Sequence, residues 1–120
     1  MTTPDALVTS FCNAWARADV DELAAFFTED GVYHNIPMAP AEGREAVHAM
    51  LTGMKAMISS IRFEVFHQVA QGNVVMNERI DHIEMGGKTV SLPVVGVFEI
   101  EGDKIRAWRD YFDMAQFAGN

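Results

Sequence analysis

Polar side chains that could carry out acid–base chemistry occur on predicted strands, at positions that should face an apolar interior. Side chains two residues apart on a strand point to the same face of a sheet. This rule pairs Tyr33 with Asn35 and Arg79 with Asp81. We therefore expect two inward-facing polar pairs on two different strands.

Asp110 is the fifth such residue, and it lies between Trp108 and Phe112 at the same two-residue spacing. A carboxylate set between two aromatic rings must be paired, hydrogen-bonded or raised in pKa, because burying an unpaired charge is costly. Arg79 is the obvious partner for it. A buried charged group of this kind is a candidate for catalysis.

The guanidinium of Arg79 has enough donors to bridge Asp81 and Asp110, one on each side. Two carboxyl groups close together in a semi-apolar site resist ionising together, so one can act as a general acid while the other acts as a base. Their titrations would be coupled. The sequence therefore offers both partners of an acid–base reaction.

Tyr33 and Asn35 supply a phenol and an amide that, with one carboxylate, could hold a water molecule in a fixed orientation. Such a set suits a small substrate that needs a proton on a leaving oxygen and attack by water at the adjacent carbon. A strained cyclic ether, an epoxide, meets both requirements. Each proton transfer by a positioned group is typically worth about 10²–10⁴-fold in rate, and no metal or organic cofactor is required.

Composition predicts a single domain over residues 1–120, because the chain has 120 residues, of which 49% are hydrophobic and 22% charged. A formal net charge of -8 argues against a nucleic-acid partner, since such proteins carry a basic patch. The start of the sequence has no leader pattern, and no apolar run is long enough to span a bilayer. We therefore expect no membrane association and a cytoplasmic location.

The sequence gives little support to metal or covalent catalysis. The single cysteine, Cys12, reads as a small buried hydrophobe and can form no disulfide within one chain. The four histidines lack metal-ligand spacing, and there is no serine elbow or glycine-rich phosphate loop. The eight methionines are expected to fill the core, with some lining a pocket.

Helical spacing dominates the first half of the chain. Thr3 before Pro4 predicts the start of a first helix, and Asp19 with Glu22 predicts the start of a short second helix whose apolar stripe reaches Phe27. Asp30-Gly31 should end it. A strand over 32–36 and a third helix over 44–57 follow.

The second half predicts four strands, over residues 61–69, 74–85, 88–100 and 104–112. The connections between them are short and rich in glycine, which indicates an antiparallel meander. Pro93 predicts a bulge or bend, because proline cannot donate to a central ladder. We expect an α+β fold in which N-terminal helices cover the concave face of a curved antiparallel sheet, forming a cone with an interior pocket.

At these residues the chain resembles the limonene-1,2-epoxide hydrolase family, within the SnoaL-like superfamily. The blocks that carry the resemblance are Tyr33-His34-Asn35 with Pro37 and Gly43-Arg44, Asn77-Glu78-Arg79-Ile80-Asp81, Gly96-Val97-Phe98, and Trp108-Arg109-Asp110-Tyr111-Phe112-Asp113. Their spacing also matches, so the resemblance covers nearly the whole chain. It implies the nuclear-transport-factor-like cone and one-step hydrolysis of a small hydrophobic, cyclic, limonene-type epoxide to a vicinal diol.

The resemblance also implies a role for each polar residue. Asp81 would protonate the epoxide oxygen, and Asp110 would take a proton from water. Arg79 would orient both carboxyl groups, while Tyr33 and Asn35 would hold the water. It further implies a homodimer that forms through the outer surface of the sheet.

Other interpretations remain open at this level. Taken singly, Arg79 with Asp81 could form an exposed ion pair, and Asp110 could be a surface carboxylate; only the joint pattern favours a site. The same scaffold could also serve a ketosteroid isomerase-like or polyketide cyclase-like enzyme. A non-catalytic module that binds a hydrophobic ligand is the third alternative.

Overall fold

One curved sheet of six strands organises the computed structural model, which describes residues 2–118. The strands are β1 (Phe27–Asn35), β2 (Ala41–Glu42), β3 (Ser60–Gln71), β4 (Val74–Met85), β5 (Lys88–Glu101) and β6 (Lys104–Tyr111). Their order in the sheet is β2-β1-β6-β5-β4-β3. Strands β3 to β6 form the antiparallel meander that the turn pattern predicts, whereas β6 pairs with β1 in parallel. The sheet is therefore not antiparallel throughout.

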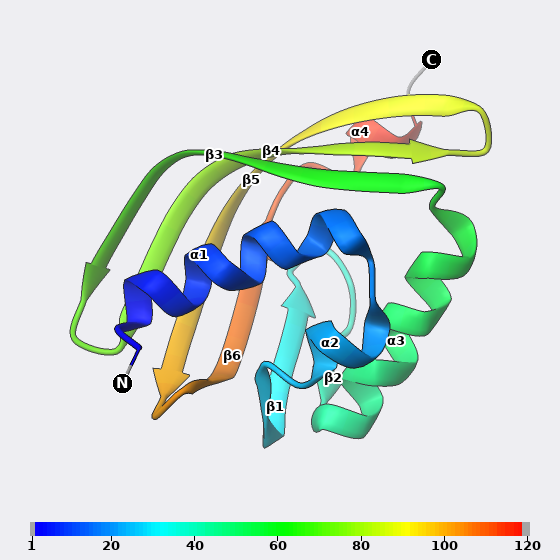
Figure 1. The fold of residues 1–120 in the computed structure, drawn as a ribbon. Coiled ribbons are helices and arrows are strands. Elements are labelled where there is room, and N and C mark those ends of the chain that lie inside the picture. The colour runs from blue at the N-terminus through cyan, green and yellow to red at the C-terminus, as the bar shows by residue number, and fades with distance from the viewer. Residues whose placement is uncertain (1, 119–120) are drawn as a thin grey trace.

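Helices cover one face of this sheet. They are α1 (Pro4–Ala14), the 3-10 segment η1 (Trp15–Arg17), α2 (Val20–Ala24), α3 (Arg44–Met57) and the short α4 (Ala115–Ala118). Figure 1 shows α1 crossing the concave side of the sheet and α3 beside β1 and β2. The expected α+β class, with N-terminal helices on a curved sheet, is confirmed.

Local capping explains where the first helices begin. The Thr3 hydroxyl accepts a hydrogen bond from the Ala6 amide, and Pro4 occupies the first helical turn, where its missing N–H costs nothing. The Asp19 carboxylate accepts from the Glu22 amide at the start of α2. Both predicted helix starts are confirmed.

The core lies between α1 and the concave face of the sheet. Phe11 on α1 is fully buried and makes edge-on contacts with Phe27, Phe98 and Trp108. Aromatic rings from three strands therefore meet one ring from the helix. This contact anchors α1 over the centre of the sheet.

Two predictions about strands are corrected. Phe27 does not belong to the second helix: it begins β1, and Asp30-Gly31 lies inside that strand, where the register with β6 is irregular between Phe27 and Val32. Pro93 causes no bulge, since the β4–β5 register continues through the Ile80–Pro93 pair. It is tolerated because β6 ends opposite Val95 and leaves no strand beside Pro93 on that side.

No helix within residues 2–118 is long and apolar enough to cross a membrane.

Candidate active site

The parallel pairing of β1 with β6 brings two of the predicted polar groups side by side. In this register Tyr33 lies opposite Trp108, and Asn35 lies opposite Asp110. The Tyr33 ring stacks on the Trp108 indole, with centroids 4.1 Å apart and planes 5° from parallel. Asn35 and Asp110 are both buried. The amide and the carboxylate therefore sit next to each other on a rigid aromatic support.

Strand β4 contributes the other pair from the same concave face. Arg79 and Asp81 lie on the same face of the strand as Val75 and Ile83, and all four are buried. Arg79 is only 1% exposed, which is far below what a surface ion pair would show. The structure thus brings Tyr33, Asn35, Arg79, Asp81 and Asp110 together on one face.

The Arg79 guanidinium bridges the two carboxylates. Its Nε donates to Asp81 Oδ1 at 2.7 Å and its Nη2 to Asp81 Oδ2 at 3.3 Å. The same Nη2 donates to Asp110 Oδ2 at 2.5 Å. The guanidinium carbon also lies 4.3 Å from the centre of the Phe63 ring. One cation is therefore held between two anions and against an aromatic face.

Asn77 is a buried polar residue of the site to which the sequence reasoning gave no role. Its Oδ1 accepts from Arg79 Nη1 at 3.2 Å, and its side chain is 2% exposed. Asn77 precedes Arg79 by two residues on β4, so the alternation that identifies Arg79 and Asp81 also predicts that Asn77 faces inward. The two-residue alternation on β4 is thus the sequence signal that identifies Asn77.

Hydrogen bonds leave some site atoms free to meet a ligand. The Tyr33 hydroxyl donates to Asn35 Oδ1 at 3.3 Å, which directs the Asn35 amide nitrogen elsewhere. Asp110 Oδ1 is buried and has no hydrogen-bond partner of good geometry among the described residues, although the Trp108 indole N–H lies close enough to lower the pKa of Asp110. A buried carboxylate oxygen of this kind is available to accept a proton or a hydrogen bond.

Burial sets the ionisation of these groups. It raises the pKa of Asp81 to about 6, against the opposing effect of the Arg79 cation. It also raises the pKa of Asp110, again opposed by Arg79. Burial alone would lower the pKa of Arg79, but the charges of Asp110 and Asp81 outweigh it and the pKa of Arg79 rises. The guanidinium is therefore a fixed cation, and the two carboxyl groups can share one proton near neutral pH.

A cavity of about 300 Å³ opens above these groups. Of the residues that the structure describes, Asp81 and Asp110 are the only charged ones that line it, and Tyr33 and Asn35 add the phenol and the amide. The remaining walls are apolar and include six of the eight methionines of the chain, namely Met38, Met50, Met54, Met57, Met85 and Met114. The cavity is therefore apolar, with a small group of polar side chains at its floor.

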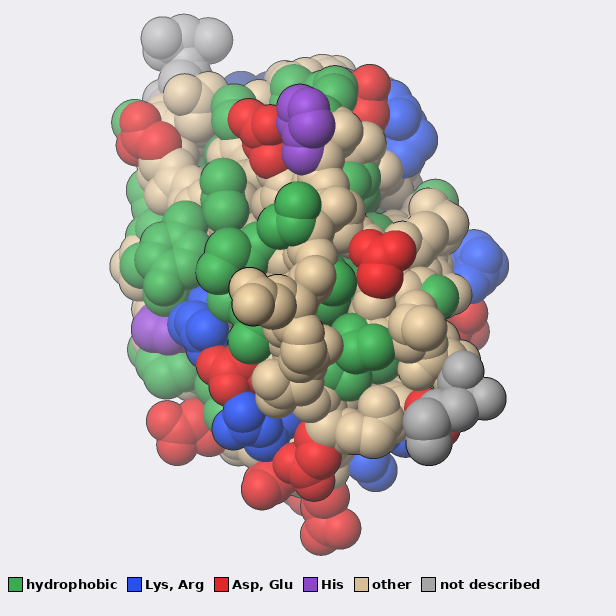
Figure 2. All heavy atoms as spheres, turned by 90° about the vertical axis from the view of Figure 1, so that its left-hand side faces the viewer, with side chains coloured by type: hydrophobic (Ala, Val, Ile, Leu, Met, Phe, Trp, Pro, Cys, Tyr) green, Lys and Arg blue, Asp and Glu red, His purple; other side chains and the backbone are tan. Residues whose placement is uncertain are grey.

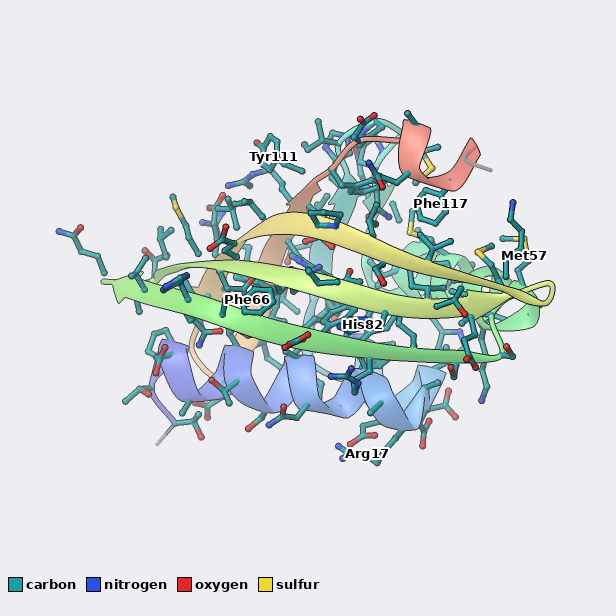
Figure 3. The ribbon with its side chains drawn as sticks, turned by 90° about the horizontal axis from the view of Figure 1, so that it is seen from above. Arg17, Met57, Phe66, His82, Tyr111 and Phe117 are labelled. Atoms are coloured by element: carbon teal, nitrogen blue, oxygen red, sulfur yellow. The ribbon has the colours of Figure 1, made fainter. Side chains whose placement is uncertain are left out.

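The segment after β6 forms part of the cavity wall. Phe112, Met114 and Phe117 all line it, and the rings of Phe112 and Phe117 meet edge to face with centroids 6.1 Å apart. Figure 3 shows the side chain of Phe117 extending from α4, with Met57 at the same end of the molecule. The C-terminal segment and the end of α3 thus contribute apolar side chains to one cavity.

No group of three or more possible metal ligands was found within residues 2–118.

Two solved structures with low sequence identity share the fold. A protein from Catenulispora acidiphila with a ketosteroid isomerase-like fold is 24% identical, with a TM-score of 0.85 over 96% of this chain and 90% of that one. A putative SnoaL-like polyketide cyclase from Shewanella denitrificans is 15% identical, with a TM-score of 0.87 over 96% and 93%. At these identities the likeness shows the cone fold alone.

Nearer relatives are epoxide hydrolases. Epoxide hydrolase EphG of Mycobacterium tuberculosis is 35% identical over 109 residues, which are 89% of this chain and 71% of that protein. The structure of an LEH-like epoxide hydrolase from the same species is 30% identical, with a TM-score of 0.84 over 94% of this chain and 84% of that one. Residues 2–119 match the limonene-1,2-epoxide hydrolase catalytic domain. The family resemblance is confirmed, and this chain belongs to the limonene-1,2-epoxide hydrolase family.

Proposed function

We propose that the protein is a cofactor-independent epoxide hydrolase that adds water in one step to a small hydrophobic epoxide, giving a vicinal diol. The observation that carries this proposal is the Arg79 guanidinium, which bridges Asp81 and Asp110 at the floor of an apolar cavity. The Tyr33–Asn35 pair lies beside that bridge. These groups supply an acid, a base and a means of holding water.

Asp110 is the base in this proposal because Asn35, the water-holding amide, lies opposite it in the β1–β6 register. A water held by Asn35 and Tyr33 gives one proton to Asp110 while its oxygen bonds to a ring carbon. The bond from that carbon to the epoxide oxygen breaks, and Asp81 gives its proton to the oxygen. Asp110 then holds a proton that Asp81 lacks, and its return to Asp81 completes the cycle.

Arg79 makes this division of labour possible. Its charge stays fixed while the proton passes from one carboxyl group to the other, so the total charge of the trio does not change during the reaction. Preorganised charge of this kind lowers the cost of reorganisation in the transition state. The Tyr33 phenol also keeps its charge unchanged, because burial raises its pKa and holds it neutral.

The cavity supports a hydrophobic, cyclic substrate of the limonene type. Apart from the polar floor its walls are methionine, isoleucine, leucine and aromatic side chains. A ring-shaped hydrocarbon attached to the epoxide would displace poorly ordered water from such walls. Unbranched methionines can also adapt to different ring shapes.

An isomerase of the ketosteroid type is the alternative on the same fold. That chemistry needs a persistently neutral aspartic acid as a hydrogen-bond donor. Here the Arg79 cation contacts both carboxyl groups and opposes the rise in their pKa, so the shared proton is not held permanently on either aspartic acid. The ion pairs therefore favour hydrolysis over isomerisation.

The outer face of the sheet supports a homodimer. Exposed apolar side chains gather there, namely Phe66, Val69, Met76, Val95 and Tyr111. Figure 2 shows hydrophobic side chains gathered on the left, the side away from α1. A contact between two copies would cover this apolar surface. Sedimentation equilibrium that gives the monomer mass at micromolar concentration would contradict the dimer.

The experiment that tests the function is a screen of cyclic and linear epoxides with product analysis. We expect a vicinal diol from at least one small cyclic epoxide, and no isomerisation of a steroid enone. Isomerisation without diol formation from any epoxide would support the alternative. Binding of hydrophobic compounds without turnover of either kind would instead support a non-catalytic module.

A further inference from the structure

A chain of hydrogen bonds runs from Arg79 to α1 behind the cavity. We propose that the buried amide of Asn77, held in place by Gln68, is a positioning element that aims the Arg79 guanidinium and ties its orientation to α1. This inference deepens the proposed function, on which its kinetic consequences rest. Asn77 and Gln68 do not line the cavity above the carboxylates. Neither residue is therefore expected to touch substrate.

The contacts form a continuous path. Arg79 Nη1 donates to Asn77 Oδ1 at 3.2 Å, and Asn77 Nδ2 donates to Gln68 Oε1 at 3.1 Å. Gln68 Nε2 then donates to the Asp5 carboxylate at 2.8 Å, to the Asp5 carbonyl at 3.1 Å and to the Thr9 hydroxyl at 3.0 Å. The path thus joins β4 and β3 to the first turns of α1.

The chemistry of the groups fixes the direction of every link. A guanidinium only donates hydrogen bonds, so the Asn77 oxygen must face it and the Asn77 nitrogen must face Gln68. Gln68 then presents its oxygen to Asn77 and its nitrogen to the acceptors on α1. Reversing either amide would set donor against donor or acceptor against acceptor. The chain of bonds therefore holds Asn77 in a single orientation.

The remaining surroundings of Asn77 oppose any other role. Its Nδ2 also lies 3.6 Å from the sulfur of Cys12, which is buried on α1. Burial raises the pKa of the Cys12 thiol to about 11, so this neighbour adds no charge at neutral pH. Asn77 is thus an uncharged side chain that fills the space between α1 and the Arg79 guanidinium.

Substitution of Asn77 tests the proposal. Asn77→Leu removes the acceptor for Arg79 Nη1, and we expect kcat to fall by up to about a hundredfold with KM little changed, because a small displacement of a catalytic group has effects of that size. Asn77→Asp keeps the acceptor but adds a third carboxylate, which should move the pH–rate profile to higher pH. Gln68→Leu removes only the second link and should cause a smaller loss in kcat.

Val65→Ala is the matched control. Val65 lies on β3 and lines the same rear cleft as Gln68, Cys12 and Thr9. Its side chain takes no part in the path of hydrogen bonds from Arg79 to α1. Its kcat and pH profile should equal those of the wild type. Equal losses in Val65→Ala and Asn77→Leu would mean that the cleft matters only for packing, which would overturn the proposal.

A readout that does not depend on turnover separates this proposal from the proposed function. In protein labelled with ¹³C at aspartate carboxyl carbons, the pKa of Asp81 should rise in Asn77→Leu, rise further in Asn77→Asp and stay unchanged in Val65→Ala. Unchanged pKa and kcat in Asn77→Leu would overturn the positioning role. If the wild type hydrolyses no epoxide, the proposed function fails and the NMR shifts alone decide the inference. If Asn77→Leu does not fold, Gln68→Leu decides it, because that variant cuts the link to α1 without adding charge, and an unchanged Asp81 pKa and kcat in it would overturn the proposal.

Discussion

Gly96 on β5 lies directly opposite Asp110 on β6, and its other neighbour in the sheet is Asn77 on β4. A Cβ atom at this position would lie 2.5 Å from Arg79 Nη1 and 3.0 Å from Asp110 Oδ1. The guanidinium therefore occupies the space that any side chain at position 96 would need. Glycine is required here for close approach and not for an unusual backbone angle.

Gly96→Ala should lower kcat by about 10²-fold, because the added methyl group displaces the guanidinium from both carboxylates. Gly53→Ala on α3 is the matched control, since a Cβ there meets no atom within 4 Å. The control should keep full activity and gain up to about 1 kcal/mol in stability, because alanine favours helix more than glycine does. Steady-state kinetics and denaturant unfolding measure both. Full activity in Gly96→Ala would contradict the placement of Arg79.

Asp81→Asn and Asp110→Asn should each reduce epoxide turnover by about 10²–10⁴-fold or more, because each removes one proton-transfer group. Both variants should fold, since an amide of the same shape replaces a carboxyl group that burial already disfavours as an ion. Circular dichroism and product analysis measure the two effects. Asp103→Asn, at an exposed turn, is the control. Retained turnover in either site variant would refute the assigned roles.

Activity should show a bell-shaped dependence on pH. The acid must be protonated, so kcat should fall as pH rises through the pKa of the acid; for Asp81 that pKa is raised to about 6. The base must be ionised, so activity should also fall on the acidic side, where both carboxyl groups hold protons. Rate measurements across pH 4–9 with one cyclic epoxide would show both limbs. A rate that does not change over that range would exclude the shared proton.

Stability should respond to pH in the opposite sense from an ordinary ion-paired carboxylate. The folded protein binds a proton at Asp81 more tightly than the unfolded chain, because the pKa rises from 3.8 to about 6. This contribution is complete below pH 4 and is lost as pH rises through 6, and it amounts to about 3 kcal/mol by linkage. The free energy of unfolding of the wild type should therefore fall across this window relative to Asp81→Asn. Parallel pH curves for the two proteins would show that Asp81 is not shifted.

The nucleophile can be identified by isotope. In a single turnover in H₂¹⁸O, direct attack by water should place the label in the diol and none in the protein. Mass spectrometry of the peptides that contain Asp81 and Asp110 provides the check. Label in either carboxyl group would indicate an ester intermediate and a different mechanism.

Much of the site follows from local alternation in the sequence. Arg79 and Asp81 share a face with Val75 and Ile83, so their burial can be predicted from one strand. Pairing across the sheet is different, because the sequence does not state that β6 lies between β1 and β5. The proximity of Asn35 and Asp110 depends on that pairing. Only the family resemblance predicts it from the sequence.

The errors made from the sequence have physical causes. Phe26 and Phe27 extend the apolar stripe of the short second helix, and a stripe alone cannot distinguish the last turn of a helix from the first residue of a buried strand. Phe27 is fully buried, as its place in the apolar stripe predicts, but it belongs to β1 and not to the helix. Strand β2 and helix α4 are too short to leave a periodic signal.

The place of β6 ties catalysis to the completion of folding. Hairpins from β3 to β6 can form through contacts between neighbouring segments, whereas β1, from the distant first half of the chain, must dock beside β6 to complete the sheet. The water-holding amide and the base become neighbours only at that step. Recovery of turnover after dilution from denaturant would therefore report the pairing of strands from the two halves of the chain, and it should lag behind the recovery of circular dichroism from the hairpins.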